Sequence, residues 1–166
     1  MGQLDTHNLE QLLQQAYDTL SLAVEAAGIG SWDWKIDTNE VSYDAHWLAM
    51  IGFLPDQVAV GNTFWEERLH PDDKTKVLSE LEEHLQNRTA SYKSEHRVRT
   101  NNGEYIWVLD VGKVIERDAF KKAKRIIGIT IDITEKILTD HKIHESEEKF
   151  KSIFEHLNDA YCRFDF

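Results

Sequence analysis

The feature that most limits the fold of this chain is a run of three segments with strand periodicity, at residues 91–99, 104–116 and 124–133. In the last of them, isoleucines alternate with small or polar residues, which is the period of two expected of a sheet strand. A Thr-Asn-Asn-Gly-Glu turn joins the first two segments, and a short basic loop joins the second to the third. Two hairpins in succession predict three adjacent antiparallel strands.

Further strands and helices precede this run. Residues 29–35 and 40–43 are expected to form short strands separated by an Asp-Thr-Asn-Glu turn, with the first of them inside the sheet. Residues 70–87 are predicted to form a longer helix capped by Asp72 or Asp73. Shorter helical turns are predicted for Ala-His-Trp-Leu-Ala-Met-Ile-Gly-Phe, Leu-Pro-Asp-Gln-Val and Asn-Thr-Phe-Trp-Glu-Glu-Arg-Leu. Because strands and helices occur in separate runs, the sequence indicates an α+β fold.

The charge of the chain disfavours nucleic-acid binding. Its formal net charge is −11, with 30 acidic against 19 basic residues, whereas a nucleic-acid binder usually presents a basic face. The one basic cluster, residues 117–125, is interpreted as a solvated hairpin loop.

No apolar run in the sequence approaches the roughly 20 residues needed to cross a bilayer. No secretory leader is evident at the N-terminus, and Cys162 alone cannot form an internal disulfide, so a cytoplasmic location is expected.

The N-terminal helix, within residues 1–27, carries an apolar seam with heptad spacing. The seam residues are Leu9, Leu13, Ala16 and Leu20, continued by Ala23 and Ala27. Such a seam predicts a homodimer through this helix. The alternative is an amphipathic helix folded back on its own domain, and fewer than three full heptads do not decide between them.

The end of the last strand runs into a helix without a loop, at Asp132, Ile133 and Thr134. Thr134 is typical of an N-cap, and Glu135 suits the first turn of a helix. We interpret this junction as a place where movement of the sheet is passed to the helix. The alternative is that these residues only cap the N-terminus of the following helix. The two interpretations are compatible with each other.

At this point the chain resembles the PAS family, in the subfamily whose domains open with a Trp-Asp-Trp strand and end in a PAC motif. The matching stretches are AAGIGSWDWKIDTNEV, WLAMIGFLPDQV, FWEERLHPDDKTKV, YKSEHRVRTNNGEYIWVLDVGKVIERD and RIIGITIDITE, which together span about residues 24–135. The resemblance implies a five-stranded antiparallel sheet of order 2-1-5-4-3, cupping a pocket under short helices. The loop Asp-Ala-Phe-Lys-Lys-Ala-Lys-Arg departs from the short glycine-containing turn usual in the family.

The end of the chain, from Glu145 on, resembles the start of another PAS domain. The expected organisation is an N-terminal helix at 1–27, a PAS domain at 28–134, a linker helix at 135–149 and the beginning of a second PAS domain at 150–166. The resemblance implies a sensory module that is not itself catalytic and relays a signal through its C-terminal helix. The expected output is a histidine kinase; a diguanylate cyclase or phosphodiesterase, and a ligand-free dimerisation module, are the alternatives.

The pocket implied by the resemblance would be lined by apolar and aromatic side chains. The candidates are Trp34, Trp47, Met50, Ile51, Phe53, Trp65, Leu69, Leu81, Ile106, Val108, Ile129 and Ile131. The same side chains would also make an ordinary packed core, because large aromatics are more often core than ligand site. The sequence therefore leaves two interpretations of these residues, a pocket for a small-molecule ligand and a packed core.

No catalytic motif occurs in the sequence, and the cofactor remains open. The flavin photoadduct branch of the family needs a Gly-x-Asn-Cys motif inside the domain, which this chain lacks. A haem ligand from His84, on the longer helix, and a non-covalent flavin are the less favoured options. His141 and His144 with Glu148 have metal-ligand spacing, but exposed linker histidines are usually solvated, so no metal site is expected.

Overall fold

The computed structural model describes residues 3–54, 57, 61 and 63–162. The chain divides into two compact units, Met1–Asp132 and Ile133–Phe166, which are considered separately below. Most of the predicted helical turn Leu-Pro-Asp-Gln-Val lies outside the described residues.

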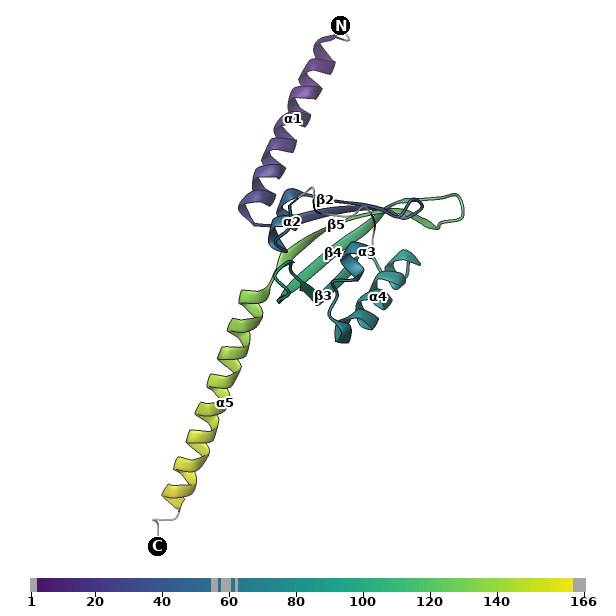
Figure 1. The fold of residues 1–166 in the computed structure, drawn as a ribbon. Coiled ribbons are helices and arrows are strands. Elements are labelled where there is room, and N and C mark those ends of the chain that lie inside the picture. Colours follow the sequence, from purple (N-terminus) through teal and green to yellow (C-terminus); the bar gives the residue numbers. More distant parts are fainter. Residues whose placement is uncertain (1–2, 55–56, 58–60, 62, 163–166) are drawn as a thin grey trace. The chain divides into compact units, whose positions relative to one another are not determined.

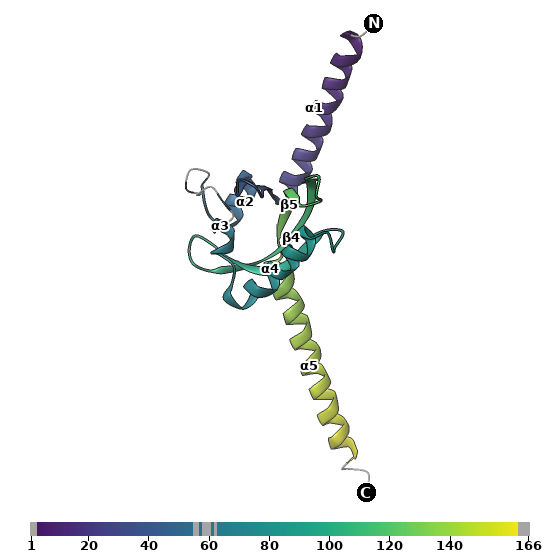
Figure 2. The same ribbon diagram turned by 90° about the vertical axis from the view of Figure 1, so that its right-hand side faces the viewer.

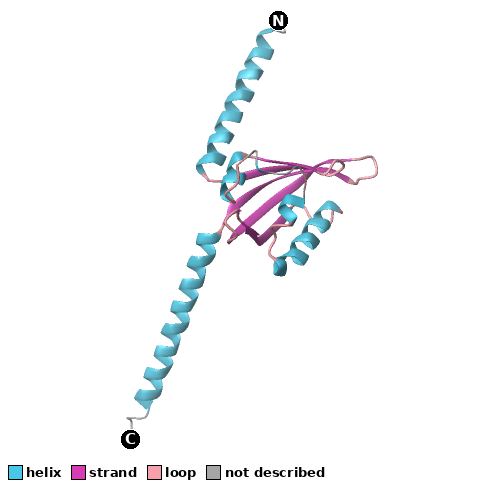
Figure 3. Ribbon diagram, in the orientation of Figure 1, coloured by secondary structure: helices cyan, strands magenta, loops and turns pink. Residues whose placement is uncertain are grey.

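The first unit contains a five-stranded antiparallel sheet of order β2-β1-β5-β4-β3 (Figures 1 and 3). Its strands are β1 (Gly30–Lys35), β2 (Glu40–Tyr43), β3 (Tyr92–Arg99), β4 (Tyr105–Arg117) and β5 (Ala123–Asp132). β1 lies inside the sheet, between β2 and β5. The predicted fold class and strand order are therefore confirmed.

Three short helices cover one face of this sheet. They are α2 (Ala45–Met50), α3 (Thr63–Glu66) and α4 (Pro71–Leu85), and Figure 2 shows the sheet curving around them. The cap of α4 differs from the prediction: His70 is the N-cap, and its Nδ1 accepts a hydrogen bond from the Asp72 backbone N–H at 3.2 Å. Pro71 takes the first helical position, which fixes the helix start and leaves both aspartates inside the first turn.

The core lies between the sheet and these helices. Alternate residues of each strand point inward, so that β3 buries Tyr92, Ser94, His96 and Val98 while the residues between them are more exposed. The buried apolar residues of the core come from both layers; they include Trp47, Leu48, Ile51, Phe64, Trp65, Leu69, Val77, Leu81, Tyr92, Val98, Val108 and Ile126.

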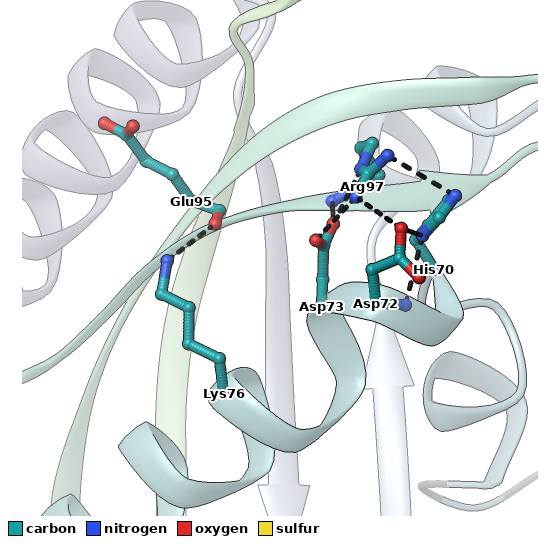
Figure 4. Close-up of polar contacts among 6 residues, drawn as sticks. All are labelled: His70, Asp72, Asp73, Lys76, Glu95 and Arg97. Carbon is teal, nitrogen blue, oxygen red and sulfur yellow. Dashed lines mark hydrogen bonds and ion pairs between the residues drawn. The ribbon is translucent and has the colours of Figure 1, made fainter.

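The outer edge of β3 is closed by the chain that leads into α4 (Figure 4). Asp73 accepts hydrogen bonds from the backbone N–H, Nε and Nη2 of Arg97, at 3.0, 2.9 and 2.8 Å. The backbone N–H of His70 donates to the carbonyl of Arg97 at 3.0 Å, and Nζ of Lys76 lies 3.4 Å from the carbonyl of Glu95. These contacts use polar groups that an edge strand would otherwise expose to pairing with another chain.

The loop between β4 and β5 has a defined shape. The Asp118 carboxylate accepts from the backbone N–H groups of Phe120 and Lys122, both at 2.9 Å, and this turn leaves the Phe120 side chain 91% exposed. Arg125, at the end of the basic cluster, has a structural role, because it pairs with Asp33 across β1 and β5. The interpretation as a solvated loop holds for the exposed Lys121 and Lys122 but not for Arg125.

Two long helices flank the sheet in sequence: α1 (Gln3–Ala26) and α5 (Thr134–Cys162). On α1 the seam residues Leu9, Leu13, Ala16 and Leu20 are all exposed, Leu13 to 62%. α5 forms the second unit and begins at Thr134, two residues after the last residue of β5. Among the described helices, none is both long and apolar enough to cross a membrane.

Candidate functional site

The register of the sheet places one row of aromatic and glycine residues across all five strands. Trp32 of β1 is the partner of Tyr43 in β2 and of Gly128 in β5. Gly128 in turn is paired with Gly112 of β4, which is paired with Tyr92 of β3. Three aromatic side chains and two glycines therefore share one level of the inner face.

The two glycines make room for the Trp32 ring. A Cβ atom on Gly128 would lie 2.2 Å from Cζ2 of Trp32, and one on Gly112 would lie 2.6 Å from Cη2. Both separations are far below van der Waals contact, so the indole lies directly over the bare backbone of β4 and β5. The ring then meets Tyr92 edge-on, with their centroids 6.5 Å apart.

The neighbouring row is polar. It contains Gly30 of β1, Thr130 of β5, Asp110 of β4 and Ser94 of β3 as consecutive register partners. Trp47 of α2 sits over Gly30, since a Cβ there would lie 2.6 Å from the Trp47 Cα.

A chain of hydrogen bonds crosses this row. Nε1 of Trp47 donates to Oγ1 of Thr130 at 3.0 Å, and the Thr130 hydroxyl donates to Oδ1 of Asp110. Both bonds are buried, so they connect α2, β5 and β4 inside the core.

Asp110 is the ionisable centre of this site. Burial raises its pKa to about 7, because an apolar interior disfavours the charged carboxylate. The Thr130 hydroxyl and the indole groups of Trp32 and Trp65 favour the charged form but do not offset the burial. Asp110 therefore exchanges its proton close to neutral pH.

His96, also fully buried, lies beside this carboxyl group. Its Nε2 is 3.6 Å from Oδ2 of Asp110, and its ring meets Trp65 edge-on at 5.9 Å. Burial lowers the pKa of His96 to about 4, because an apolar interior disfavours the charged imidazolium. Near neutral pH the imidazole is uncharged.

A cavity of about 30 Å³ adjoins Asp110. Its walls are mostly aromatic; they comprise Trp32, Trp34, Val41, Tyr43, Trp47, Trp65, Leu81, Tyr92 and Asp110. The volume corresponds to roughly two water-sized molecules.

The structure places the predicted pocket residues in three locations. Trp34, Trp47, Trp65 and Leu81 line the cavity. Six others belong to the packed core or contact it, namely Met50, Ile51, Phe53, Leu69, Ile106 and Val108.

The last two predicted residues, Ile129 and Ile131, are assigned to the wrong face. They alternate with Thr130, whose side chain points inward, and so lie on the opposite side of β5. The alternation of isoleucines correctly predicted a strand, but it did not say which face is inner. The inner face instead carries Ile126, Gly128 and Thr130, because the Trp32 ring needs the space above Gly128.

Sequence reasoning missed five lining residues: Trp32, Val41, Tyr43, Tyr92 and Asp110. A signal for Asp110 was present, since it is a charged residue two positions after the inward-facing Val108, within the otherwise apolar stretch 106–111. Its position on the inner face follows from the period of two.

His84 has a structural role. The backbone N–H of Val114 donates to its Nε2 at 3.1 Å, so the proton is on Nδ1, which donates to the carbonyl of Thr89 at 3.1 Å. Both ring nitrogens are thus bound to protein, and neither is available to a haem iron. These contacts support a structural interpretation of His84 over the haem ligation considered from the sequence.

The linker histidines show no metal-binding arrangement. His144 lies 3.6 Å from Glu148, with both side chains exposed. Within the part of the chain that the structure describes, no three His, Cys, Asp or Glu residues are grouped so as to hold a metal ion.

Comparison with known proteins agrees with this architecture. Residues 40–130 match the family model described as the PAS fold. A sensory box histidine kinase/response regulator from Burkholderia thailandensis has a similar structure, with a TM-score of 0.70 and 28% identity over 80% of this chain and 98% of that one. The chain belongs to the PAS family.

Its curated relatives are signalling proteins. The probable diguanylate cyclase DgcE of Escherichia coli is 26% identical over 152 residues, which is 91% of this chain and 13% of that protein. The two-component sensor PprA of Pseudomonas aeruginosa is 32% identical over 98 residues, or 59% of this chain and 10% of that protein. The chain thus spans only about a tenth of the length of each of these two relatives, and they support a signalling role for it.

Proposed function

We propose that this chain is a sensory module, itself without catalytic activity, in which a change at the Asp110 cavity is passed along β5 to α5. The observation that carries the proposal is the position of Thr130. Its hydroxyl is bound to both Trp47 and Asp110, and it stands on β5 two residues before the strand ends at Asp132. α5 begins at Thr134, so three residues lie between the cavity contact at Thr130 and the start of the helix.

The output of the longer protein is proposed to be a histidine kinase. The similarity to PprA and to the Burkholderia protein supports this assignment. A diguanylate cyclase is the second candidate, because DgcE aligns with 91% of this chain. In either case residues 135–149 would be the linker, residues 150–166 would begin a further PAS domain, and the protein would act in the cytoplasm.

A rival proposal is a dimer joint without a ligand. The exposed seam of Leu9, Leu13, Ala16 and Leu20 on α1 supports it, because such a stripe is normally covered by a partner helix. The two proposals differ in whether the cavity matters to the output. A dimerisation module would transmit a movement through its helices regardless of what the Asp110 cavity contains.

The test uses the full-length protein with two variants. Thr130→Val removes the hydroxyl that links the site to β5, and Asp132→Ala removes the carboxylate at the strand end. We expect both to change output, measured as histidine autophosphorylation from ATP and as cyclic dinucleotide formation from GTP. Whichever activity responds identifies the output domain. Ile129→Val, on the opposite face of β5, is the matched control and should leave output unchanged.

Thermal unfolding of the same variants separates signalling from folding. We expect Asp132→Ala to lower thermal stability only slightly, since Asp132 is exposed. If Asp132→Ala unfolds the protein outright, Asp132 is required for the fold and its role in signalling cannot be claimed from this variant. Normal output in both variants would make the junction a passive connection and favour the dimer joint.

A further inference from the structure

We propose that the Asp110 cavity binds a small primary ammonium ion of about the size of methylammonium. This inference rests on the proposed function in treating the cavity as the input site. It names the chemical class of the ligand, which neither the fold nor the relatives specify.

The first argument is the missing counter-charge of Asp110. Among the described residues, no lysine or arginine forms an ion pair with this carboxylate. Within the described part of the chain, the ion-pair neighbour of Asp110 is His96, which is uncharged near neutral pH. A buried carboxylate without a cation is costly, and a cation in the adjoining cavity would supply the pairing.

The second argument is the aromatic wall. Four tryptophans and two tyrosines line the cavity: Trp32, Trp34, Trp47, Trp65, Tyr43 and Tyr92. Aromatic faces attract cations, tryptophan most strongly, and several such rings around one point form the box that proteins use for organic ammonium groups. An anion would be repelled by the carboxylate of Asp110, and the aromatic faces would not attract it.

The third argument is the match of hydrogen-bonding groups. A primary ammonium has three N–H donors and no acceptor. The site offers the carboxylate of Asp110 and the buried hydroxyl oxygens of Tyr43 and Tyr92, the second of which lies close to the Ser94 hydroxyl. Both tyrosines line the same cavity as Asp110, and burial and, secondly, the charge of Asp110 raise the pKa of each.

Size limits the ligand further. A cavity of about 30 Å³ holds roughly two non-hydrogen atoms, which is one carbon and one nitrogen. Methylammonium satisfies this limit. Tetramethylammonium is larger and has no N–H to donate, so it should bind more weakly.

The test is a titration of the chain with methylammonium chloride, at a pH above the value of about 7 at which Asp110 ionises. Tryptophan fluorescence and the backbone amide NMR signals around Thr130 report occupancy. We expect saturable binding of methylammonium, and none of methanol, its neutral isostere, or of potassium chloride at equal ionic strength. Equal binding of methanol, or no saturable change with methylammonium, would overturn the proposal; in the second case the cavity holds only water.

Variants locate the binding. Asp110→Asn keeps the shape and the acceptor for Thr130 but removes the charge, so the dissociation constant should rise at least about tenfold. Asp37→Asn, at the surface, is the matched control and should bind as the wild type does. If Asp110→Asn does not fold, Tyr92→Phe, which removes one proposed acceptor, should also weaken binding. Unchanged affinity in the folded variants would overturn the assignment of the site.

The outcomes distinguish this inference from the proposed relay. Saturable binding at Asp110, with output unaffected by Thr130→Val, would uphold the ligand and reject the relay. A changed output in Thr130→Val without methylammonium binding would reject the ligand and uphold the relay.

Discussion

Asp110 and Thr130 are register partners on β4 and β5, and the hydroxyl of Thr130 donates a hydrogen bond to Oδ1 of Asp110. The same hydroxyl accepts from Nε1 of Trp47, at 3.0 Å. One threonine therefore joins an ionisable group, the central strand and a covering helix. A change in the charge of Asp110 must alter the hydrogen bond of a residue on β5.

The first prediction concerns the dependence of stability on pH. The pKa of Asp110 is raised to about 7 in the folded state, so its contribution to stability is full below about pH 4 and is lost as the pH rises through 7. The pKa of His96 is lowered to about 4, so its contribution is full above about pH 6.5 and is lost as the pH falls through 4. Between these limits the two slopes oppose each other.

Single variants should separate the two slopes. Relative to the wild type, Asp110→Asn should become more stable as the pH rises from about 4 to about 6.5, and His96→Gln should become less stable over the same range. Urea unfolding at a series of pH values measures both. Slopes of the same sign in the two variants would contradict the assigned protonation states.

The second prediction concerns the glycine under Trp32. Gly112→Ala would place a methyl group 2.6 Å from Cη2 of Trp32 and should lower the free energy of unfolding by about 1–3 kcal/mol. In a Trp32→Leu background, Gly112→Ala should lower the free energy of unfolding by clearly less, because the smaller leucine side chain leaves room for the added methyl group. A double-mutant cycle by chemical denaturation gives this coupling. Equal costs in both backgrounds would show that the ring is not the obstacle.

Gly112 and Gly128 also show which parts of the fold can be predicted from the sequence and which cannot. Strand periods and the two hairpins predicted the antiparallel strands, because they depend on local pattern, and the family resemblance implied the sheet order. The inner face of β5 could not be predicted, since the choice of Thr130 over Ile129 depends on where Trp32, 98 residues earlier than Thr130, places its ring. Asp110 was missed for another reason, since the period of two already places it on the same face as Val108. The structural role of His84 was not predicted because its partners, Thr89 and Val114, come from separate segments.

The third prediction concerns the closed edge of β3. Asp73→Ala removes three hydrogen bonds to Arg97 and should cost about 1.5–3 kcal/mol of stability. The hydrogen bonds from Arg97 lower the pKa of Asp73 to about 2, so the contribution is present above pH 3.8 and is lost as the pH falls through about 2. Asp72→Ala, at a side chain 76% exposed, is the control and should change stability by about 0.5 kcal/mol or less. Similar losses in both variants, measured by thermal unfolding, would argue against a specific role of Asp73.

The fourth prediction concerns assembly. If the α1 seam pairs two copies, the double variant Leu13→Glu with Leu20→Glu should be monomeric, since it places charges in a dry interface. Leu22→Glu, at an exposed leucine outside the seam, should stay dimeric. Sedimentation equilibrium distinguishes these states. A wild-type chain that is monomeric at high micromolar concentration would rule out the seam as a dimer interface.

The most direct test of the account is hydrogen exchange in α5 when the cavity contact is broken. Backbone amide exchange of residues 134–150 is measured by mass spectrometry in the wild type, in Thr130→Val and in the control Ile129→Val. We predict that Thr130→Val changes exchange in β5 and also in this part of α5, while Ile129→Val changes neither by a comparable amount. A Thr130→Val chain with altered exchange in α2 and β5 but wild-type exchange in α5 would contradict the claim that the site communicates with the helix.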